Sequence, residues 1–265
     1  MATTSRIIAR ALFGGALFFV AAGSSAAASA RHITIAAAAD LHYAMDAVIA
    51  GYRRAHPQDT IDVTYGSSGK LLVQIEQGAP FDLFFSADSD YPRQLVAHGD
   101  AVGKPMPYVL GRIVLWSSSL DASQLSMANL AQARFDRIAI ANPQHAPYGK
   151  LAVQALHAAA VWDAVEPKLV YGENIAQTAQ FAVSGNVKVG IIAHSLALAP
   201  EMAKRGSYAQ IPTSLYQPLV QSFVMTRRGA DNSLARDFSH YILGPASRKV
   251  LSGYGFGLPQ AMASH

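Results

Sequence analysis

The sequence predicts an α/β fold with two lobes, in which mostly parallel sheets are flanked by helices and a ligand cleft separates the lobes. Short apolar runs typical of strands alternate with stretches whose apolar residues recur at helical spacing. Residues 31–110 and 114–212 each hold a separate series of such patterns. A strand and helices that follow Tyr216 are expected to return to the first lobe and complete it.

Residues 1–30 are predicted to be a cleaved signal peptide. Arg6 and Arg10 precede the apolar run 11–22, and Ala28-Ser29-Ala30 supplies the small residues that a signal peptidase reads. The apolar run has about 12 residues, fewer than the roughly 20 that a membrane-spanning helix needs. We therefore expect cleavage after residue 30 and export into a bacterial-type periplasm.

The composition excludes several classes of function. The chain has no cysteine, so disulfides, thiolate-bound metals and cysteine nucleophiles are ruled out. Its formal net charge of +4 falls to +2 when the two arginines of the leader are removed. No run of basic residues with interleaved aromatics occurs, and we expect no nucleic-acid partner.

The first strand and helix follow directly after the leader. Residues 33–38 form a short apolar run that predicts a buried strand. The next apolar residues are Leu41, Met45, Val48 and Tyr52, whose spacing is typical of one helix face. The junction between the two patterns is polar, because it contains an aspartate.

A second strand and helix come next, and a third strand follows them. Alternating apolar residues predict a strand over 61–65, and a helix over 71–75 ends before Gly78 and Pro80. Residues 81–85 predict the third strand. Further strands are expected at 113–116, 137–141, 187–192 and 222–226, and further helices at 149–160, 175–183 and 233–242.

The positions of these elements suggest where the chain passes between lobes. Crossings are expected near residues 110–113 and 213–218. Lobe 1 would then consist of residues 31–112 and 215–265, and lobe 2 of residues 113–214.

Three strand-to-helix junctions, at 37–41, 65–70 and 143–149, carry small and polar residues. A helix start has unpaired N–H groups and a partial positive charge, so it can hold an anion. In open α/β sheets a ligand binds beyond the carboxyl ends of the strands. Serine and aspartate are also ordinary helix caps. Three such junctions facing one cleft nevertheless favour an anion-binding site.

The serines of the second junction do not fit a catalytic motif. Gly66-Ser-Ser-Gly69 lacks the Gly-x-Ser-x-Gly spacing of a nucleophile elbow. The pair Gly69-Lys70 is followed by leucine, whereas a phosphate-binding P-loop requires serine or threonine. We expect no catalytic residue and no enzymatic activity. The remaining enzymatic alternative is a periplasmic hydrolase in which His194 activates Ser68.

Several motifs span almost the whole chain after the leader. They are residues 36–45, 66–69, 74–80, 82–88, 143–149, 190–192 and 254–256. In this order they resemble the periplasmic molybdate-binding proteins of ABC importers. The resemblance implies a type II periplasmic binding protein fold that closes on a tetrahedral oxyanion, molybdate or tungstate. It further implies delivery to the membrane subunits of an ABC permease, with no cofactor besides the bound anion. We expect a monomer.

The resemblance also suggests which residues bind the oxyanion. It implies that Ser68 offers its hydroxyl and amide, and that Tyr148 and Ile175 offer backbone donors. Asp40 occupies a position that is usually serine or asparagine in the family, and Ala193 one that is often tyrosine. Two side-chain donors of the family are therefore absent from this chain.

Four further residues are candidates for an accessory role. They are Ser67, His42, Lys70 and His194. The two histidines and the lysine would offset the charge of Asp40. Asp40, His42 and His194 together would barely meet the ligand number of a metal site, and we expect no metal ion there.

Asp40 is the informative departure from the family pattern. A carboxylate about 4 Å from one negative charge costs roughly 4 kcal/mol at an effective dielectric constant of 20. The side chain could cap its own helix and point away from the ligand, it could accept a hydrogen bond from a protonated oxyanion, or the ligand could carry less charge. We hypothesise that Asp40 shifts selectivity toward protonatable oxyanions. A binder of phosphate or arsenate is the alternative within this class.

Overall fold

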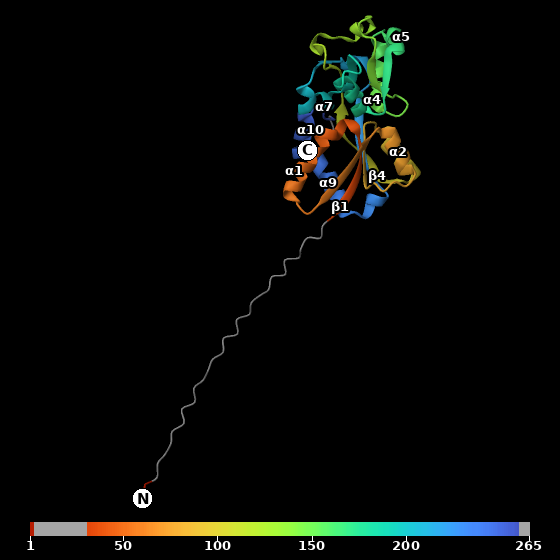
Figure 1. The fold of residues 1–265 in the computed structure, drawn as a ribbon. Coiled ribbons are helices and arrows are strands. Elements are labelled where there is room, and N and C mark those ends of the chain that lie inside the picture. The colour runs from red at the N-terminus through yellow and green to blue at the C-terminus, as the bar shows by residue number, and fades with distance from the viewer. Residues whose placement is uncertain (3–30, 260–265) are drawn as a thin grey trace.

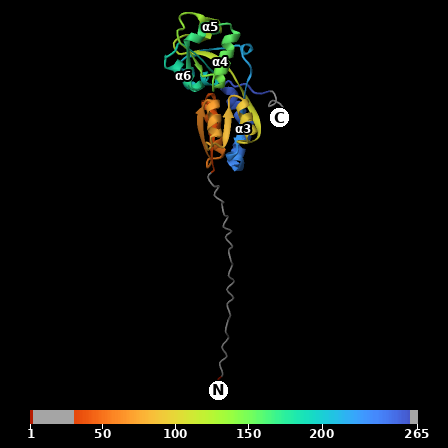
Figure 2. The same cartoon turned by 90° about the vertical axis from the view of Figure 1, so that its right-hand side faces the viewer.

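The computed structural model describes residues 1–2 and 31–259, and it has two lobes with one sheet each (Figure 1). The predicted signal peptide falls almost wholly in 3–30, outside the described residues. Within the described part of the chain, no helix combines the length and hydrophobicity needed to cross a membrane. The view turned by 90° shows the two lobes stacked end to end (Figure 2).

Each lobe contains a five-stranded sheet, and the strands below are given in spatial order. Lobe 1 holds β2 (Thr60–Gly66), β1 (His32–Ala38), β3 (Leu83–Ser86), β10 (Leu219–Thr226) and β4 (Ala101–Gly111). Lobe 2 holds β7 (Leu169–Gly172), β6 (Ile138–Ala141), β8 (Val189–Ala193), β5 (Ile113–Ser117) and β9 (Ser207–Gln210).

The strands of both sheets run mostly in one direction. In lobe 1, β1 pairs parallel with β2 and β3, while β10 pairs antiparallel with β3 and β4. In lobe 2, β6 pairs parallel with β7 and β8, while β5 pairs antiparallel with β8 and β9. Only β10 and β5 therefore run against the other described strands, and the predicted two-lobed, mostly parallel α/β fold is confirmed.

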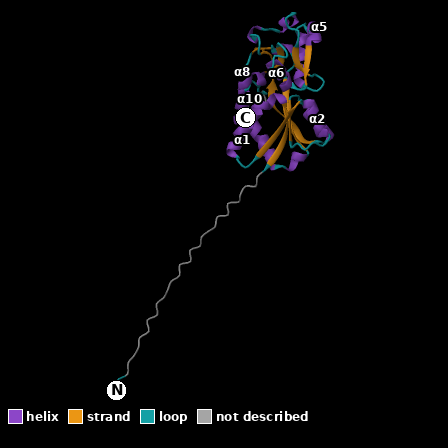
Figure 3. Ribbon diagram, viewed as in Figure 1, coloured by secondary structure: helices purple, strands orange, loops and turns teal. Residues whose placement is uncertain are grey.

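Helices cover the faces of both sheets (Figure 3). Those of lobe 1 are α1 (His42–Ala55), α2 (Ser68–Glu76), α3 (Asp90–His98), α9 (Ser233–Leu243) and α10 (Pro245–Gly253). Those of lobe 2 are α4 (Pro147–Ala158), α5 (Trp162–Val165), α6 (Ile175–Val183), α7 (His194–Ala197) and α8 (Pro200–Ala203). Short 3₁₀ turns occupy Ala39–Leu41, Ala122–Gln124, Met127–Ala131, Glu166–Lys168, Thr213–Leu215 and Arg228–Asp231.

The chain passes from lobe 1 to lobe 2 between β4, which ends at Gly111, and β5, which begins at Ile113. It returns between Gln210 and Leu219, where β9 ends and β10 begins. Because β10 inserts between β3 and β4, the returning segment is a central strand of lobe 1 and not an appendage.

The apolar core is divided between the lobes. Lobe 1 has one buried cluster on each face of its sheet, and lobe 2 has one larger cluster. Ala38, Ala39 and Ala87 of lobe 1 pack into the lobe 2 cluster. Small side chains at this point allow the backbones of the two lobes to approach closely, which places the carboxyl ends of β1 and β3 against lobe 2.

Several elements escaped prediction from the sequence pattern. They are β4, β7, β9, α3, α10 and the short helices α5, α7 and α8. Strand β4 lacks regular alternation, because it contains Gly103, Pro105 and Pro107 and is mostly solvent-accessible over its first half. The helix expected at 149–160 begins two residues earlier, at Pro147, since proline is well suited to the first helical position.

Candidate functional site

A small pocket lies where the two lobes meet, and both lobes form its walls. Lobe 1 contributes the ends of β1, β2 and β3, and lobe 2 contributes the starts of α4 and α6. The space open to the centre of a water-sized molecule is about 10 Å³, so the pocket is narrow. Ala38, Ala39, Ala87 and Ala146 are among the lining residues. Because its walls are short side chains and backbone, the polar groups that a ligand would meet here are mainly those of the main chain.

Three long helices begin at this pocket with unpaired backbone donors. Ser68 opens α2, Tyr148 is the second residue of α4, and Ile175 opens α6, and all three line the pocket. The amide groups of these residues make no hydrogen bond to any other described residue. The first amides of a helix have no intrahelical acceptor. Because their positive ends meet at one place, the three helices make this pocket favourable for an anion.

The hydroxyl of Ser68 is held in place while its hydrogen stays available. Ser68 is buried, and its Oγ accepts a hydrogen bond of 3.0 Å from the amide of Ala87. Among the described residues, no acceptor takes the hydroxyl hydrogen of Ser68. A hydroxyl has one donor and two acceptor sites. Its oxygen is thus fixed by the end of β3, and its hydrogen can be donated to a ligand.

Asp40 lies in the wall of the pocket and is buried. Its Oδ2 accepts hydrogen bonds from the hydroxyl of Tyr148 at 2.8 Å and from Nε2 of Gln221 at 2.6 Å. The hydroxyl of Tyr108 donates to Oε1 of Gln221 at 2.8 Å. Tyr148 belongs to lobe 2 and the other three residues to lobe 1. This buried polar cluster therefore joins the lobes beneath the pocket.

The capping alternative for Asp40 is wrong. The turn Ala39–Leu41 and helix α1 both begin without a side-chain cap. The carboxylate instead faces the polar cluster with Tyr148 and Gln221. Burial raises the pKa of Asp40 to about 6, although the hydrogen bonds from Gln221 and Tyr148 lower it in part. Asp40 is therefore a carboxyl group that changes charge close to neutral pH.

Contacts across the cleft hold the rim of the pocket together. The amide of Gly69 donates to the carbonyl of His145 at 2.9 Å, and Nδ1 of His145 lies 3.0 Å from Oγ of Ser67. Lys70 forms an ion pair of 2.5 Å with Glu173, which precedes α6. Exposed ion pairs contribute little stability. The hydrogen bond between Gly69 and His145 therefore restricts the approach of the two lobes more than the ion pair does.

The other predicted site residues lie elsewhere. Ala193 is buried at the end of β8, and the ring of the adjacent His194 interacts with Gln210 at 3.1 Å. His42 is half-exposed beside Tyr65 and 3.8 Å from Asp46. The structure thus brings Asp40, Ser67, Ser68, Tyr148 and Ile175 to one pocket, whereas His42, Lys70, Ala193 and His194 do not line it.

The described residues do not bring Ser68 and His194 together. The partner of the Ser68 hydroxyl is the amide of Ala87, and the described chain places no histidine within hydrogen-bond distance of it. Residues 31–259 contain no cluster of three or more histidine, aspartate or glutamate side chains suited to a metal ion. The predicted pair of Ser68 and His194 is thus not formed, while the neighbouring Ser67 has its Oγ 3.0 Å from Nδ1 of His145.

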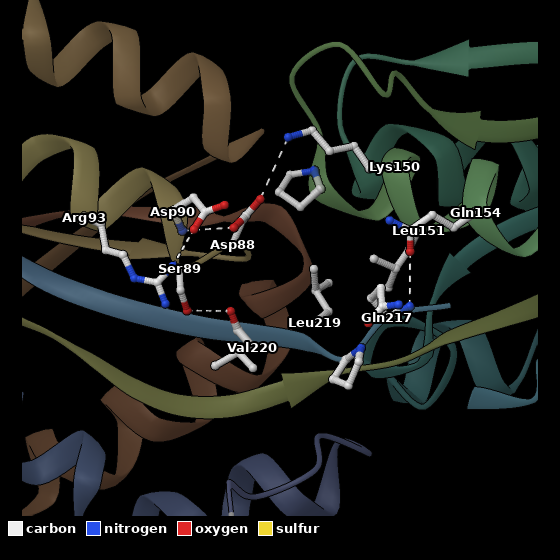
Figure 4. Close-up of a pocket in the computed structure, with 12 residues that line it drawn as sticks. Asp88, Ser89, Asp90, Arg93, Lys150, Leu151, Gln154, Gln217, Leu219 and Val220 are labelled. Carbon is white, nitrogen blue, oxygen red and sulfur yellow. Dashed lines mark hydrogen bonds and ion pairs between the residues drawn. The ribbon is translucent and has the colours of Figure 1, made fainter. Parts of the chain in front are cut away.

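A wider pocket adjoins the first between α3, α4 and the returning segment (Figure 4). Lys150 reaches across it toward Asp88 at 3.9 Å, and Gln154 accepts a hydrogen bond from the amide of Gln217. Asp88 and Asp90 both line it. Because its wall carries the carboxylates of Asp88 and Asp90 beside one lysine and one arginine, it is a poorer site for an anion than the small pocket.

Gln221, Tyr108 and His145 were missed by reasoning from the sequence. Gln221 is a completely buried polar residue within the apolar run 219–226, and this anomaly was visible in the sequence. Nothing in the sequence indicated that the phenol of Tyr148 would reach Asp40, which lies 108 positions away.

The sequence and the fold of this chain are similar to those of known proteins. A profile of the family described as "Bacterial extracellular solute-binding protein" matches residues 33–257. The molybdate-binding protein ModA of Azotobacter vinelandii is 34% identical over 233 residues, which cover 88% of this chain and 92% of that protein. ModA of Rhodobacter capsulatus is 35% identical over 198 residues, with 74% and 77% covered.

The solved structure of the A. vinelandii periplasmic molybdate-binding protein is similar with a TM-score of 0.80 and 28% sequence identity. The alignment covers 86% of this chain and all of that one.

Replacing Asp40 by asparagine is expected to stabilise the protein at neutral pH. Folding raises the pKa of Asp40 from its ordinary value to about 6, so the ionised carboxylate disfavours the folded state above that pH. The penalty amounts to about 3 kcal/mol and disappears as the pH falls below the unfolded pKa of about 4. Urea unfolding of the wild-type protein and of Asp40→Asn at pH 4 and pH 7.5 measures this penalty. A stability difference between the two proteins that does not change with pH would contradict this assignment.

Proposed function

This chain belongs to the family of bacterial extracellular solute-binding proteins, and we propose that it captures a tetrahedral oxyanion, most favourably molybdate or tungstate, for ABC import. It is a binding protein and not an enzyme. The observation that carries the proposal is the meeting of three helix starts at one buried pocket. Their unpaired amides at Ser68, Tyr148 and Ile175 come from both lobes, so a bound anion would hold the lobes together.

The chemistry of the pocket favours a compact oxyanion over a larger anion. Several donors converge on it, since the hydroxyl of Ser68 adds to the three amides. No lysine, arginine or histidine lines the pocket, so the charge of the ligand would be balanced by helix dipoles and hydrogen bonds. The ligand set that we propose is Ser68, Tyr148 and Ile175, with Asp40 beside them and Ser67 as an accessory donor.

The remaining assignments follow from the same proposal. We take residues 1–30 as the leader that directs the protein to the periplasm, residues 31–112 with 215–265 as lobe 1, and residues 113–214 as lobe 2. The protein would act as a monomer that presents both lobes to the membrane subunits of an ABC permease. This division is supported by the strand composition of the two sheets.

Calorimetric titration of the ligand-stripped protein, beginning at Arg31, tests the proposed function. Molybdate and tungstate are expected to bind at least a hundredfold more tightly than sulfate or phosphate, because relatives of this chain are molybdate-binding proteins and one solved structure of such a protein has the same fold. Tighter binding of phosphate or arsenate would support the alternative ligand class. Absence of binding for all these anions would refute the proposal.

Removal of the Ser68 hydroxyl is expected to weaken molybdate binding. A hydrogen bond to a charged group contributes about 1.5–3 kcal/mol, so Ser68→Ala should raise Kd roughly ten- to hundredfold. Ser239→Ala is the matched control, because the Ser239 hydroxyl donates within helix α9 to Ala235. Equal affinities of the two variants would show that the hydroxyl of Ser68 does not contact the ligand.

Substitution of Gly69 is expected to hinder closure of the lobes. A Cβ atom at this position would lie 2.8 Å from the carbonyl oxygen of His145 in the opposite lobe. Overpacking of this kind costs about 1–3 kcal/mol, so Gly69→Ala should raise the Kd for molybdate roughly five- to hundredfold. Gly253→Ala is the control, since its Cβ would meet no atom within 4 Å. An unchanged Kd in Gly69→Ala would mean that binding does not require this close approach.

A further inference from the structure

Asp40 is the one acidic side chain in the lining of the small pocket. Its presence opposes anion binding only while it is ionised, because a carboxylate and a bound anion repel each other strongly at a buried site. We propose that Asp40 takes up one proton on Oδ1 when the oxyanion binds. The resulting hydroxyl group keeps this proton and donates a hydrogen bond to an oxygen of the anion. This inference rests on the proposed function and identifies Asp40 as a residue that determines specificity.

The hydrogen bonds of Asp40 decide which of its oxygens can carry the proton. Oδ2 accepts from both the hydroxyl of Tyr148 and Nε2 of Gln221, at 2.8 and 2.6 Å. Two donors therefore point at Oδ2, and a proton on this oxygen would compete with them. Oδ1 is buried and has no hydrogen-bond partner within the described residues. The proton of the neutral carboxyl group consequently resides on Oδ1.

The orientation of Gln221 supports the placement of the proton on Oδ1 of Asp40. The hydroxyl of Tyr108 donates to Oε1 of Gln221, so the amide nitrogen faces Asp40. Gln221 also donates to the oxygen of Tyr148 at 3.0 Å, which leaves the Tyr148 hydrogen for Asp40. The buried phenols stay neutral, because burial raises the pKa of Tyr108 and Tyr148 well above the ordinary value. Asp40 is the only member of this cluster that titrates near neutral pH.

A buried polar atom without a partner is costly, since it gives up its hydrogen bonds to water. When the carboxyl group is neutral, Oδ1 carries a hydrogen, and an oxygen of the anion can accept a hydrogen bond from it. Repulsion between two negative charges is thereby replaced by a charge-assisted hydrogen bond. The polar cluster would then contribute one donor to the ligand in the place where the family usually has serine or asparagine.

Other titratable groups lie on the elements around the pocket, and those at its rim are paired with one another. His145, before α4, contacts Ser67 and lies 3.7 Å from Glu173, and Glu173 is also paired with Lys70. The remaining groups on elements that pack near Asp40 are His42 and Tyr43 of α1, Tyr65 of β2, His194 of α7 and Arg112 between β4 and β5. His145 contacts Ser67, which lines the pocket. The experiment must therefore distinguish proton uptake by His145 from proton uptake by Asp40.

The pH dependence of binding follows from this protonation. The pKa of Asp40 is about 6 before binding, and a neighbouring anion raises it further. Above pH 6 the empty protein is mostly ionised, and binding of a dianion requires proton uptake. The Kd for molybdate should therefore increase roughly tenfold for each pH unit above about 6, until the pH reaches the pKa of the bound state.

Calorimetry in buffers of different ionisation enthalpy measures proton uptake directly. For the wild-type protein titrated with molybdate at pH 7.5, we expect uptake of close to one proton for each bound anion. Asp40→Asn is expected to bind molybdate without proton uptake and with a Kd that no longer rises with pH. The variant is matched, because its amide oxygen must face Tyr148 and Gln221, which places its NH₂ group where Oδ1 was.

Two further variants distinguish Asp40 from its neighbours. Asp82→Asn neutralises another buried carboxylate of lobe 1, which accepts from the amide of Thr34 away from the pocket, and should retain proton uptake. His145→Gln should also retain it. Loss of proton uptake in His145→Gln, or its persistence in Asp40→Asn, would overturn the inference.

The wild-type titration separates this inference from the proposed function. Tight molybdate binding without proton uptake would refute the role of Asp40 and leave the proposed function intact. Failure of the wild-type protein to bind molybdate, tungstate, sulfate, phosphate or arsenate at pH 5.5 or 7.5 would refute the function and the inference together.

Discussion

The site depends on one electrostatic arrangement, in which the starts of α2, α4 and α6 meet across the boundary between two lobes. A single helix start attracts an anion only weakly in water, because solvent screens its charge. Three starts around a pocket shielded from solvent act in a medium of lower polarity, where each donor counts for more. The alanines around the pocket keep it small, and the contact at Gly69 brings its two walls close together.

Much of this arrangement could be predicted from the sequence, because it depends on local patterns. The junctions at 37–41, 65–70 and 143–149 are strand ends followed by helix starts, and such boundaries leave a clear signature in the residue types. The topology of α/β sheets then places strand ends at a common edge. Ser68, Tyr148 and Ile175 were assigned to one site only through the family resemblance, and the start of α6 was not among the three junctions that the residue pattern identified.

The polar cluster beneath the pocket could not be predicted in the same way. Its members Asp40, Tyr108, Tyr148 and Gln221 come from four separate elements, and their contacts result from tertiary packing. Whether the carboxylate of Asp40 capped its helix or faced its neighbours depended on a side-chain direction that residue spacing does not encode. Strand β4 was missed for a related reason, since its pairing with β10 compensates for a sequence with weak strand character.

The insertion of β10 between β3 and β4 determines which of the two sheets has all its strands first during synthesis. All strands of lobe 2 are complete once residue 210 has been synthesised, whereas the sheet of lobe 1 lacks a central strand until residue 226. Until then β3 and β4 have no strand between them, and their facing edges are unpaired. The lobe that starts the chain is thus the last to have all its strands, and its sheet can be completed only after lobe 2 has been synthesised.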